Sequence, residues 1–320
     1  MEHIRSDGRR RPHVVCLGAA TFDTIFRMDA LPSGPGKVLP TEVVQIAHGM
    51  ASSAAAAIVK LGGASTLFAR VGDDAVGDTI IRDLSESGVD CSFIRRCEGI
   101  RSPICTVLVD AVGERIVVPY YDPRLERDPD WLPLDYIAAA DAALVDVRWP
   151  EGAAVVLRTA RDASVPAVLD ADVGPREVIF GLARVASHAV FSEPAATIAT
   201  GESEPTRALK TLAKELDGFV AVTAGADGCF WFDRASGTIR GSRPPAVVAV
   251  DTLAAGDVFH GAFTLALAES RSIEAAIAFA NVAAALKCRN FGGRLGAPAR
   301  AEVDALLAET GGRHGPCRGN

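Results

Sequence analysis

One segment of the chain combines small, hydroxyl and carboxyl side chains in a pattern that could do chemistry. It reads VDTLAAGDVFHGAF over residues 250–263. The pattern predicts the end of an apolar stretch, followed by small residues at which a helix begins. Because the free N–H groups at a helix start carry partial positive charge, this segment could bind an anion.

Asp257 lies within the first turn of this predicted helix. A carboxylate there is expected to stay ionised, and it could accept a proton from a hydroxyl group. The alternative is that Asp257 only favours the helix dipole, as acidic residues in first turns commonly do. These residues alone therefore predict either an anion site with a general base or an ordinary helix start.

The elements that would position this segment indicate an α/β fold. Short apolar strands are predicted at 14–18, 65–71, 142–147, 167–170, 189–191 and 219–223. Helices are predicted at 49–61, 74–87, 152–163, 205–216, 255–269, 273–288 and 301–307, and an antiparallel hairpin at 229–240. Strands that alternate with helices are typical of a parallel sheet covered by helices on both faces.

Two β-rich segments interrupt this alternation. Pro- and Gly-punctuated runs at 24–46 and 103–121 predict two hairpins that pair with each other. We expect one α/β unit at 13–310, with a lid formed by about 24–47 and 98–121. Polar, Arg-rich residues 1–12 and Gly-rich residues 311–320 predict flexible tails.

Composition excludes several functional classes. The chain has 320 residues, of which 49% are hydrophobic, and its net charge of −7 argues against a general binder of nucleic acid or anionic membranes. No apolar run reaches 18 residues, and no secretory signal follows the N-terminal arginines. Seven scattered cysteines without metal-binding spacing predict free thiols in a cytoplasmic protein.

The segment ending in Asp257 closely resembles the C-terminal signature of the ribokinase-like (PfkB) sugar kinases, and the resemblance covers roughly Val14 to Leu307. It implies a three-layer α/β/α core with a mostly parallel sheet and a small β-sheet lid. It also implies phosphoryl transfer from ATP, with the anion hole at Ala254, Ala255 and Gly256 and the catalytic base at Asp257. The commonest family form has Gly at 254, and the methyl group of Ala254 is a mild departure that is acceptable if its φ stays negative.

The same resemblance assigns further residues. It places substrate contacts on Asp23, Gly49 and Ser53, and nucleotide contacts on Thr223, Gly225, Gly228, Thr252, Asn281 and Gly293. Asp23 could instead be a strand-end turn residue, and Asn281 a surface residue. Two family motifs are altered: Ser53 replaces an Asn, and Ser192-Glu193-Pro194-Ala195 replaces Asn-x-x-Glu. Mg²⁺ would then be organised by Glu193 through water.

Within the family, the chain resembles the sulfofructose kinases. The matching segments are 33–37, 113–116, 146–149, 191–194, 256–261, 285–288 and 292–294. The resemblance implies phosphorylation at C1 of 6-deoxy-6-sulfofructose, with Lys37 and Arg148 gripping the sulfonate. Pro119 stands where those kinases have an Asn, and it has no side-chain donor.

Other interpretations remain open at this point. If Lys37 is solvated and Arg148 pairs with Asp146 or Asp172, a neutral sugar such as fructose or ribose, or a nucleoside, would be the substrate. The altered magnesium motif also allows a sugar-sensing protein without turnover. The expected cofactors are ATP and Mg²⁺, with a monovalent cation left open. Exposed strand edges of the lid favour a homodimer.

Overall fold

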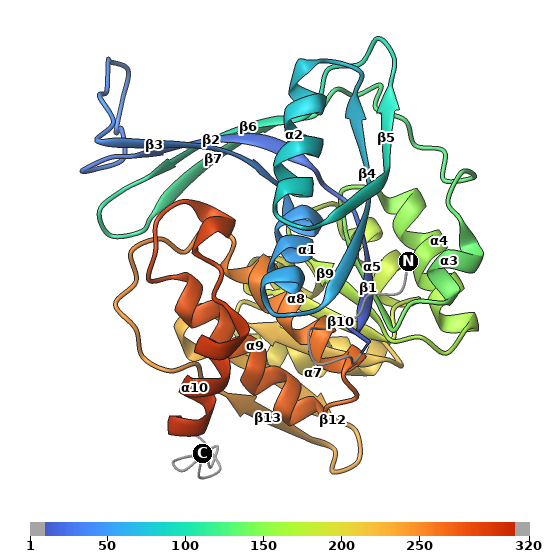
Figure 1. Ribbon diagram of the computed structural model, residues 1–320. Coiled ribbons are helices and arrows are strands. Elements are labelled where there is room, and N and C mark those ends of the chain that lie inside the picture. Colours follow the sequence, from blue (N-terminus) through green and yellow to red (C-terminus); the bar gives the residue numbers. More distant parts are fainter. Residues whose placement is uncertain (1–9, 311–320) are drawn as a thin grey trace.

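A nine-stranded sheet forms the centre of the molecule in the computed structural model, which describes residues 10–310 (Figure 1). The strand order is β13 (Thr238–Ser242), β12 (Cys229–Asp233), β11 (Phe219–Thr223), β10 (His188–Ser192), β9 (Ala167–Ala171), β8 (Ala142–Asp146), β1 (His13–Leu17), β4 (Ala64–Gly72) and β5 (Asp90–Cys97). The strands from β11 to β5 are parallel, and β12 and β13 are antiparallel. The predicted α/β class is confirmed.

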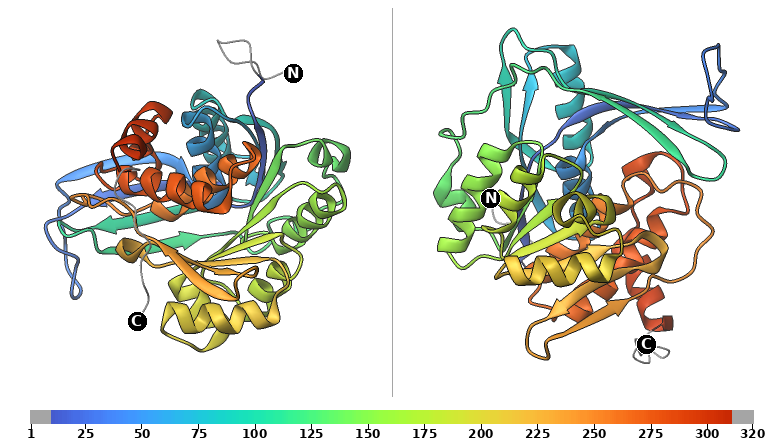
Figure 2. Two further views of the ribbon diagram at one scale, coloured as in Figure 1. Left: turned by 90° about the horizontal axis from the view of Figure 1, so that it is seen from below. Right: turned by 180° about the vertical axis from the view of Figure 1, so that it is seen from behind.

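Helices cover both faces of this sheet, as the view from below in Figure 2 shows. One layer contains α1 (Met50–Lys60), α2 (Ala75–Glu86), α8 (Ala255–Ala268), α9 (Ile273–Lys287) and α10 (Arg300–Thr310). The other contains α3 (Leu134–Ala138), α4 (Pro150–Asp162), α5 (Arg176–Ala183), α6 (Glu193–Thr200) and α7 (Pro205–Glu215). The apolar side chains of each layer pack against alternate residues of the strands and form a separate buried cluster.

Close packing of α1 against α8 fixes where α8 begins. A Cβ at Gly261 would lie 2.7 Å from the carbonyl oxygen of Ala54, so glycine is required for this approach. The Ala-rich sequence of α1 serves the same contact, because small side chains let two helices lie near each other. The start of α8 is thereby held close to the carboxyl ends of the parallel strands, where ligands bind in open α/β sheets.

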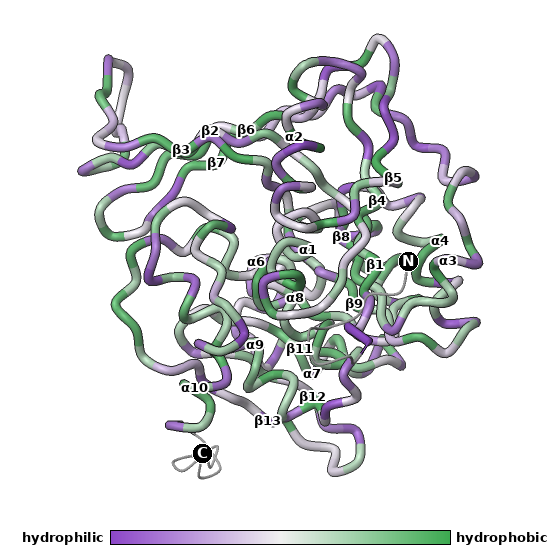
Figure 3. Tube along the Cα trace, viewed as in Figure 1, coloured by the Kyte–Doolittle hydropathy of each residue, from purple (hydrophilic) through white to green (hydrophobic). Residues whose placement is uncertain are grey.

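A second sheet of four strands extends from the main body. Its order is β3 (Glu42–His48), β2 (Thr21–Arg27), β6 (Ile104–Val109) and β7 (Arg115–Tyr120). The predicted hairpins are both present, and the parallel pair β2·β6 joins them. One face packs on Leu253, beside the start of α8. The other exposes apolar side chains of Val43, Ile104, Ile116 and Val118, and Figure 3 shows hydrophobic stretches along these strands.

Several elements were not predicted from the sequence: β5, α3, α5 and α6. Strand β5 has only one neighbour, β4, and its sequence DCSFIRRC is correspondingly polar. An edge strand carries charged residues that hide the usual apolar pattern. The six cysteines that the structure describes are free, as expected.

The first described residues are bound to the body. Arg10 pairs with Asp141, and the carbonyl of Pro12 accepts the N–H of Ala64 at 2.8 Å. The predicted flexible tail at 1–12 is therefore wrong for residues 10–12, while 1–9 and the predicted tail at 311–320 lie outside the described residues. Between residues 10 and 310, no helix is long and apolar enough to cross a membrane.

Candidate active site

Two adjoining pockets lie where the start of α8 meets the carboxyl ends of the parallel strands. The inner pocket, of about 500 Å³, lies between the sheet and the lid; the outer pocket, of about 570 Å³, lies between α8, α9 and the segment 243–249. Thr223, Thr252 and Gly256 line both pockets. A group bound at this junction could therefore pass from a ligand in one pocket to a ligand in the other.

Asp257 lines the inner pocket from the first turn of α8. Burial, together with the nearby carboxyl groups of Asp170 and Asp172, raises the pKa of Asp257 well above its ordinary value. The favourable effect of the helix start on the ionised carboxyl group is thus opposed by burial and by like charges. A raised pKa makes the ionised group a stronger proton acceptor, as a general base requires.

The backbone before Asp257 forms a strained helix start. Ala254 is the N-cap of α8 and has a φ of +64°, so the condition of a negative φ at this residue is not met. Its carbonyl accepts the N–H of Val258 at 2.9 Å, which fixes the first turn of the helix. A left-handed conformation at a non-glycine residue costs about 1–2 kcal/mol. This conformation turns the chain so that Gly256 borders both pockets.

Asp23 and His48 form a buried pair in the lid side of the inner pocket. His48 Nδ1 lies 3.3 Å from Asp23 Oδ2, and Thr21 Oγ1 donates to Asp23 Oδ1. Burial raises the pKa of Asp23 to about 7, although the Thr21 hydrogen bond opposes this. Burial and the charge of Arg294 lower the pKa of His48 to about 3, so its ring is neutral. Asp23 is thus a buried acceptor facing the pocket, and not merely a strand-end turn residue.

Gly49 also lines the inner pocket, whereas Ser53 does not reach it. Ser53 lies one turn into α1, fully buried within the core. The structure therefore brings Asp23, Gly49 and Asp257 together and leaves the predicted contact of Ser53 outside the pocket.

A buried carboxylate, Asp146, organises the floor of the pocket. It accepts backbone N–H groups of Ala19 at 2.8 Å, Ala51 at 3.1 Å and Arg148 at 2.8 Å. A Cβ at Gly18 would lie 2.1 Å from Asp146 Oδ2, so only glycine leaves room for this carboxylate. Asp146 thereby joins the ends of β1 and β8 to the start of α1.

Arg148 and Lys37, the two cations expected to grip the substrate, lie in different parts of the molecule. Arg148 lines the inner pocket, and its guanidinium donates to the carbonyl of Val173 at 2.9 Å; its bond to Asp146 is made by the backbone. Lys37 lies in the exposed loop between β2 and β3 and does not line the pocket. Pro119 does line it. Of the two residues of the expected clamp, only Arg148 therefore lines the inner pocket.

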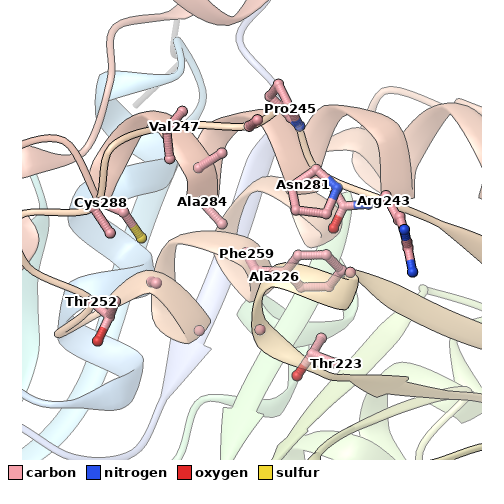
Figure 4. Close-up of a pocket in the computed structure, with 18 residues that line it drawn as sticks. Thr223, Ala226, Arg243, Pro245, Val247, Thr252, Phe259, Asn281, Ala284 and Cys288 are labelled. Atoms are coloured by element: carbon pink, nitrogen blue, oxygen red, sulfur yellow. The ribbon is translucent and has the colours of Figure 1, made fainter. Parts of the chain in front are cut away.

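The outer pocket is largely apolar, and Figure 4 shows the labelled residues that border it. Thr223, Gly225 and Gly228 line it from the β11–β12 turn, opposite Asn281 and Ala284 of α9. Asn281 is 4% exposed and donates to the carbonyl of Ser242 at 2.8 Å, so it is not a surface residue. A planar ring could lie between the segment 244–249 and α9, with charged groups directed toward Gly256.

Gly293 does not line either pocket. Its φ is +58°, and its N–H donates to Asp251 Oδ2 at 2.9 Å. A Cβ there would lie 2.9 Å from His48 Nε2. The predicted nucleotide contact of Gly293 is thus not seen, and this residue instead supports the loop that precedes α8.

Glu193 is exposed at the start of α6 and lines neither pocket. Within residues 10–310, no group of three carboxyl, histidine or cysteine side chains could hold a metal ion. Mg²⁺ needs only one or two carboxylates when it is carried by phosphates. The carboxyl group of Asp172, which accepts from Ser192 Oγ at 2.8 Å and lines the inner pocket, fits that limited requirement, with Glu193 just beyond Ser192.

Sequence reasoning missed several residues of the site. Asp170 and Asp172 stand at the end of β9, and His260 lies 3.5 Å from Asp170. Arg115 of the lid lines the inner pocket and donates to Thr252. The signal for Asp170 and Asp172 was available, because the carboxyl ends of parallel strands meet at one edge. Arg115 was recognised only as part of a matching segment.

Comparison with known proteins agrees with this geometry. Residues 11–300 match the sequence profile of the pfkB family carbohydrate kinases. The chain is 28% identical over 305 residues to a ribokinase of Bacillus subtilis strain 168, covering 92% of this chain and 99% of the relative. It is 29% identical over 299 residues to an ATP-dependent ribose-1-phosphate kinase of Halopiger xanaduensis, covering 92% and 98%. A crystal structure of a candidate ribokinase from Agrobacterium tumefaciens has a TM-score of 0.92 and 50% identity, covering 95% of this chain and 100% of that one.

Proposed function

The chain belongs to the pfkB family of carbohydrate kinases, and we propose that it transfers the γ-phosphoryl group of ATP to a primary hydroxyl of a small sugar in the inner pocket. The observation that carries this proposal is the position of Asp257 and Gly256. Asp257 faces the inner pocket, while Gly256 borders both pockets at their junction. A hydroxyl beside Asp257 can therefore meet a terminal phosphate that enters past Gly256.

In this reaction Asp257 accepts the proton of the sugar hydroxyl while the hydroxyl oxygen forms its bond to the γ-phosphorus. The bond between that phosphorus and the β,γ-bridging oxygen breaks, and ADP leaves. The start of α8 at 254–257 and the guanidinium of Arg115 stabilise the negative charge on the transferred group. Mg²⁺ bound with ATP would neutralise phosphate charge beside Asp172.

We assign the outer pocket to the nucleotide. Its apolar walls at 244–249 and α9 suit an adenine ring, and Asn281 adds a polar edge. Thr223, Gly225 and Gly228 border the side from which phosphates would extend toward Gly256. Thr252, which lines both pockets, would contact the phosphates at the junction.

For the sugar, we propose that Asp23 and the backbone near Gly49 bind hydroxyl groups, and that Arg148 faces the end remote from the reacting hydroxyl. A guanidinium there favours an anionic tail, and 6-deoxy-6-sulfofructose phosphorylated at C1 remains our first candidate. The Halopiger relative is named for ribose 1-phosphate, which also carries an anionic group.

A neutral sugar is the second candidate. Four carboxyl groups line the inner pocket, from Asp23, Asp170, Asp172 and Asp257, and Lys37 does not balance them. Carboxylates accept hydrogen bonds from hydroxyl groups, so this lining suits ribose or fructose, and the ribose portion of a nucleoside would present the same hydroxyl groups. The complete arrangement at Asp257 and Gly256 favours turnover over the alternative of a sugar-sensing protein.

The exposed face of the lid sheet supports a homodimer. Val43, Ile104, Ile116 and Val118 present apolar side chains there, and β3 and β7 are edge strands. Pairing with a second copy would cover both the apolar face and the strand edges. Sedimentation analysis should show a dimer that dissociates in a Val118→Asp variant, whereas a monomeric parent protein would contradict the proposal.

The function is tested by a substrate panel at a fixed concentration of MgATP. We would compare kcat/KM for 6-deoxy-6-sulfofructose, fructose 6-phosphate, ribose 1-phosphate, fructose and ribose, and detect the sugar phosphate directly. An Arg148→Met variant should lose at least about tenfold with the preferred anionic sugar and little with neutral ones. Arg158→Met on α4 is the control for a changed charge. If fructose or ribose is preferred and Arg148→Met has no effect, the neutral assignment holds. If none of the five is phosphorylated, the proposed substrate class is wrong.

A further inference from the structure

Lys287 is a buried lysine beside the loop that leads into α8. Its side chain is 0% exposed, at the last position of α9. The ammonium nitrogen donates to the carbonyl oxygen of Asp251 at 2.7 Å and lies 3.2 Å from Asp251 Oδ2. A positive charge is thus held three residues before Ala254, the residue that begins α8.

Asp251 connects this charge to two loops. Its carboxylate accepts the N–H of Leu253 at 2.8 Å, and the N–H groups of Gly292 and Gly293 at 3.0 Å and 2.9 Å. The loop that presents Ala254 and Gly256 is therefore tied to the loop after α9 through one carboxylate. Because Ala254 holds a strained φ, this anchoring fixes the direction of the first N–H groups of α8.

Burial of an ammonium group is costly unless its partners compensate for lost water. Here burial lowers the pKa of Lys287, while the charge of Asp251 and the hydrogen bond to it oppose that shift. An apolar side chain at the end of α9 would fill the same space without this cost. The retained charge indicates a role in balancing Asp251.

The contacts of Asp251 also bear on whether a free monovalent cation fits at the loop that precedes α8. Such an ion needs several oxygen ligands, and at Asp251 the available ones are its carbonyl and carboxylate oxygens. The described contacts already engage these oxygens with Lys287 and three N–H groups. The residues present therefore do not fit an additional cation at Asp251.

We propose that Lys287 is a positioning residue whose tethered ammonium group takes the place of a bound monovalent cation, so that this enzyme needs no potassium. This inference rests on the proposed kinase function for its catalytic readout. The ammonium balances Asp251, and the anchored loop then holds the anion hole in position for phosphoryl transfer.

The first test is the cation dependence of the unaltered enzyme. With the best sugar of the panel and saturating MgATP, kcat should change less than about twofold when Na⁺ is replaced by K⁺ at constant ionic strength. A Lys287→Ala variant should lose about 100-fold or more in kcat, with a much smaller change in KM for the sugar. K⁺ or NH₄⁺ should restore much of that kcat with saturation, because either ion fits the vacated space. Lys287→Met should lose kcat without rescue, because its side chain fills that space.

Lys60 provides a matched control. Its ammonium donates to the carbonyl oxygens of Leu295 and Ala297, so it also binds the loop after α9 but does not contact Asp251. Lys60→Ala should keep its basal kcat and show no rescue by K⁺ or NH₄⁺. Rescue of both variants would mean that the ions act on the loop generally, which would overturn the assignment to Lys287.

A second readout needs no catalysis. The Tm of Lys287→Ala should rise by a few degrees when K⁺ or NH₄⁺ replaces Na⁺, since an ion that binds only the folded state stabilises it. The Tm of the unaltered protein should not respond. If K⁺ activates that protein more than about twofold, or if its own Tm rises, the proposal is wrong even where Lys287→Ala cannot be purified. Failure of every sugar in the panel would count against the proposed function but leave this binding readout interpretable.

Discussion

Arg115 Nη1 in the lid donates a hydrogen bond of 2.6 Å to Thr252 Oγ1 in the loop before α8. The same hydroxyl contacts the carbonyl of Gly113 at 3.4 Å. The lid therefore touches the segment that leads to α8, and Arg115 of the inner pocket bonds to Thr252, which borders both pockets. The side chain of Arg115 therefore links the position of the lid to the positive charge beside Thr252.

Replacement of Arg115 by Ala should lower kcat about 10- to 100-fold, because a cation at the junction is lost as negative charge develops on the transferred group. Steady-state assays of sugar phosphate formation measure this effect. Hydrolysis of ATP without transfer should rise relative to transfer, since the lid loses its contact with Thr252. Arg96→Ala, which removes an exposed cation paired with Asp73 and Asp78, should match the parent protein. Equal behaviour of the two variants would argue against a catalytic contribution from Arg115.

Replacement of Asp257 by Asn should reduce kcat about 1,000-fold or more while sugar binding persists, because only the proton acceptor is removed. Single-turnover assays and calorimetric titration separate the two quantities. Asp162→Asn, at the exposed end of α4, is the control. Retention of most of the rate in Asp257→Asn would show that another group takes the proton.

Replacement of Gly256 by Ala should impair transfer without harming the fold. Among the described residues, no neighbouring heavy atom lies within 4 Å of the position its Cβ would take, and the added methyl group would stand at the junction of the pockets. The free energy of unfolding should stay equal or rise by up to about 1 kcal/mol, since Ala favours helices over Gly. Gly181→Ala on α5, which also meets no neighbour among the described residues, should give the helix gain with full activity. A fully active Gly256→Ala enzyme would exclude close approach of phosphate at this position.

The pH dependence of the free energy of unfolding should show the raised pKa of Asp23. Its pKa is raised to about 7 in the folded protein by burial, against about 3.9 in the unfolded chain. The folded state therefore holds this proton more tightly, and the resulting stabilisation is complete below about pH 4 and lost as the pH rises to about 7. The free energy of unfolding of the parent protein, relative to that of Asp23→Asn, should fall across this window and level off above it. A flat difference would mean that Asp23 titrates normally.

Replacement of Ala254 by Gly should relieve the left-handed strain at the start of α8. The gain is offset by the greater freedom of glycine in the unfolded chain, so we expect a net stabilisation between zero and about 1 kcal/mol. Ala266→Gly, in the interior of the same helix, should instead destabilise by about 1 kcal/mol or more. Denaturant unfolding compares the two variants, and a marked loss of stability in Ala254→Gly would contradict the strain at this residue.

Local patterns predicted much of this molecule. The alternation of strands and helices from residue 141 onward, the two lid hairpins and the helix start at Asp257 follow from periodicity, turn residues and small side chains. Strand β5 was not predicted, because its position at the sheet edge permits polar residues. Boundaries set by local preference were thus predictable, whereas elements defined by their neighbours were not.

Long-range geometry limited the prediction of the site. The loop that carries Lys37 connects β2 to β3, and its composition does not indicate where it lies relative to the inner pocket. Burial of Lys287 depends on where α9 ends relative to Asp251, 36 positions earlier in the chain. The positive φ of Ala254 is opposite to the negative φ that alanine prefers, so the residue type did not predict it. Each of these features requires knowledge of tertiary contacts.

The lining of the two pockets divides the polypeptide into separate tasks. Every residue that borders the outer pocket comes from positions 223–288, whereas the inner pocket draws much of its wall from positions 21–173. Under the proposed function, substitutions at positions 21–173 would alter the choice of phosphoryl acceptor and leave the proposed nucleotide cavity unchanged. Acceptor preference would then diverge among related enzymes while their ATP binding stays the same.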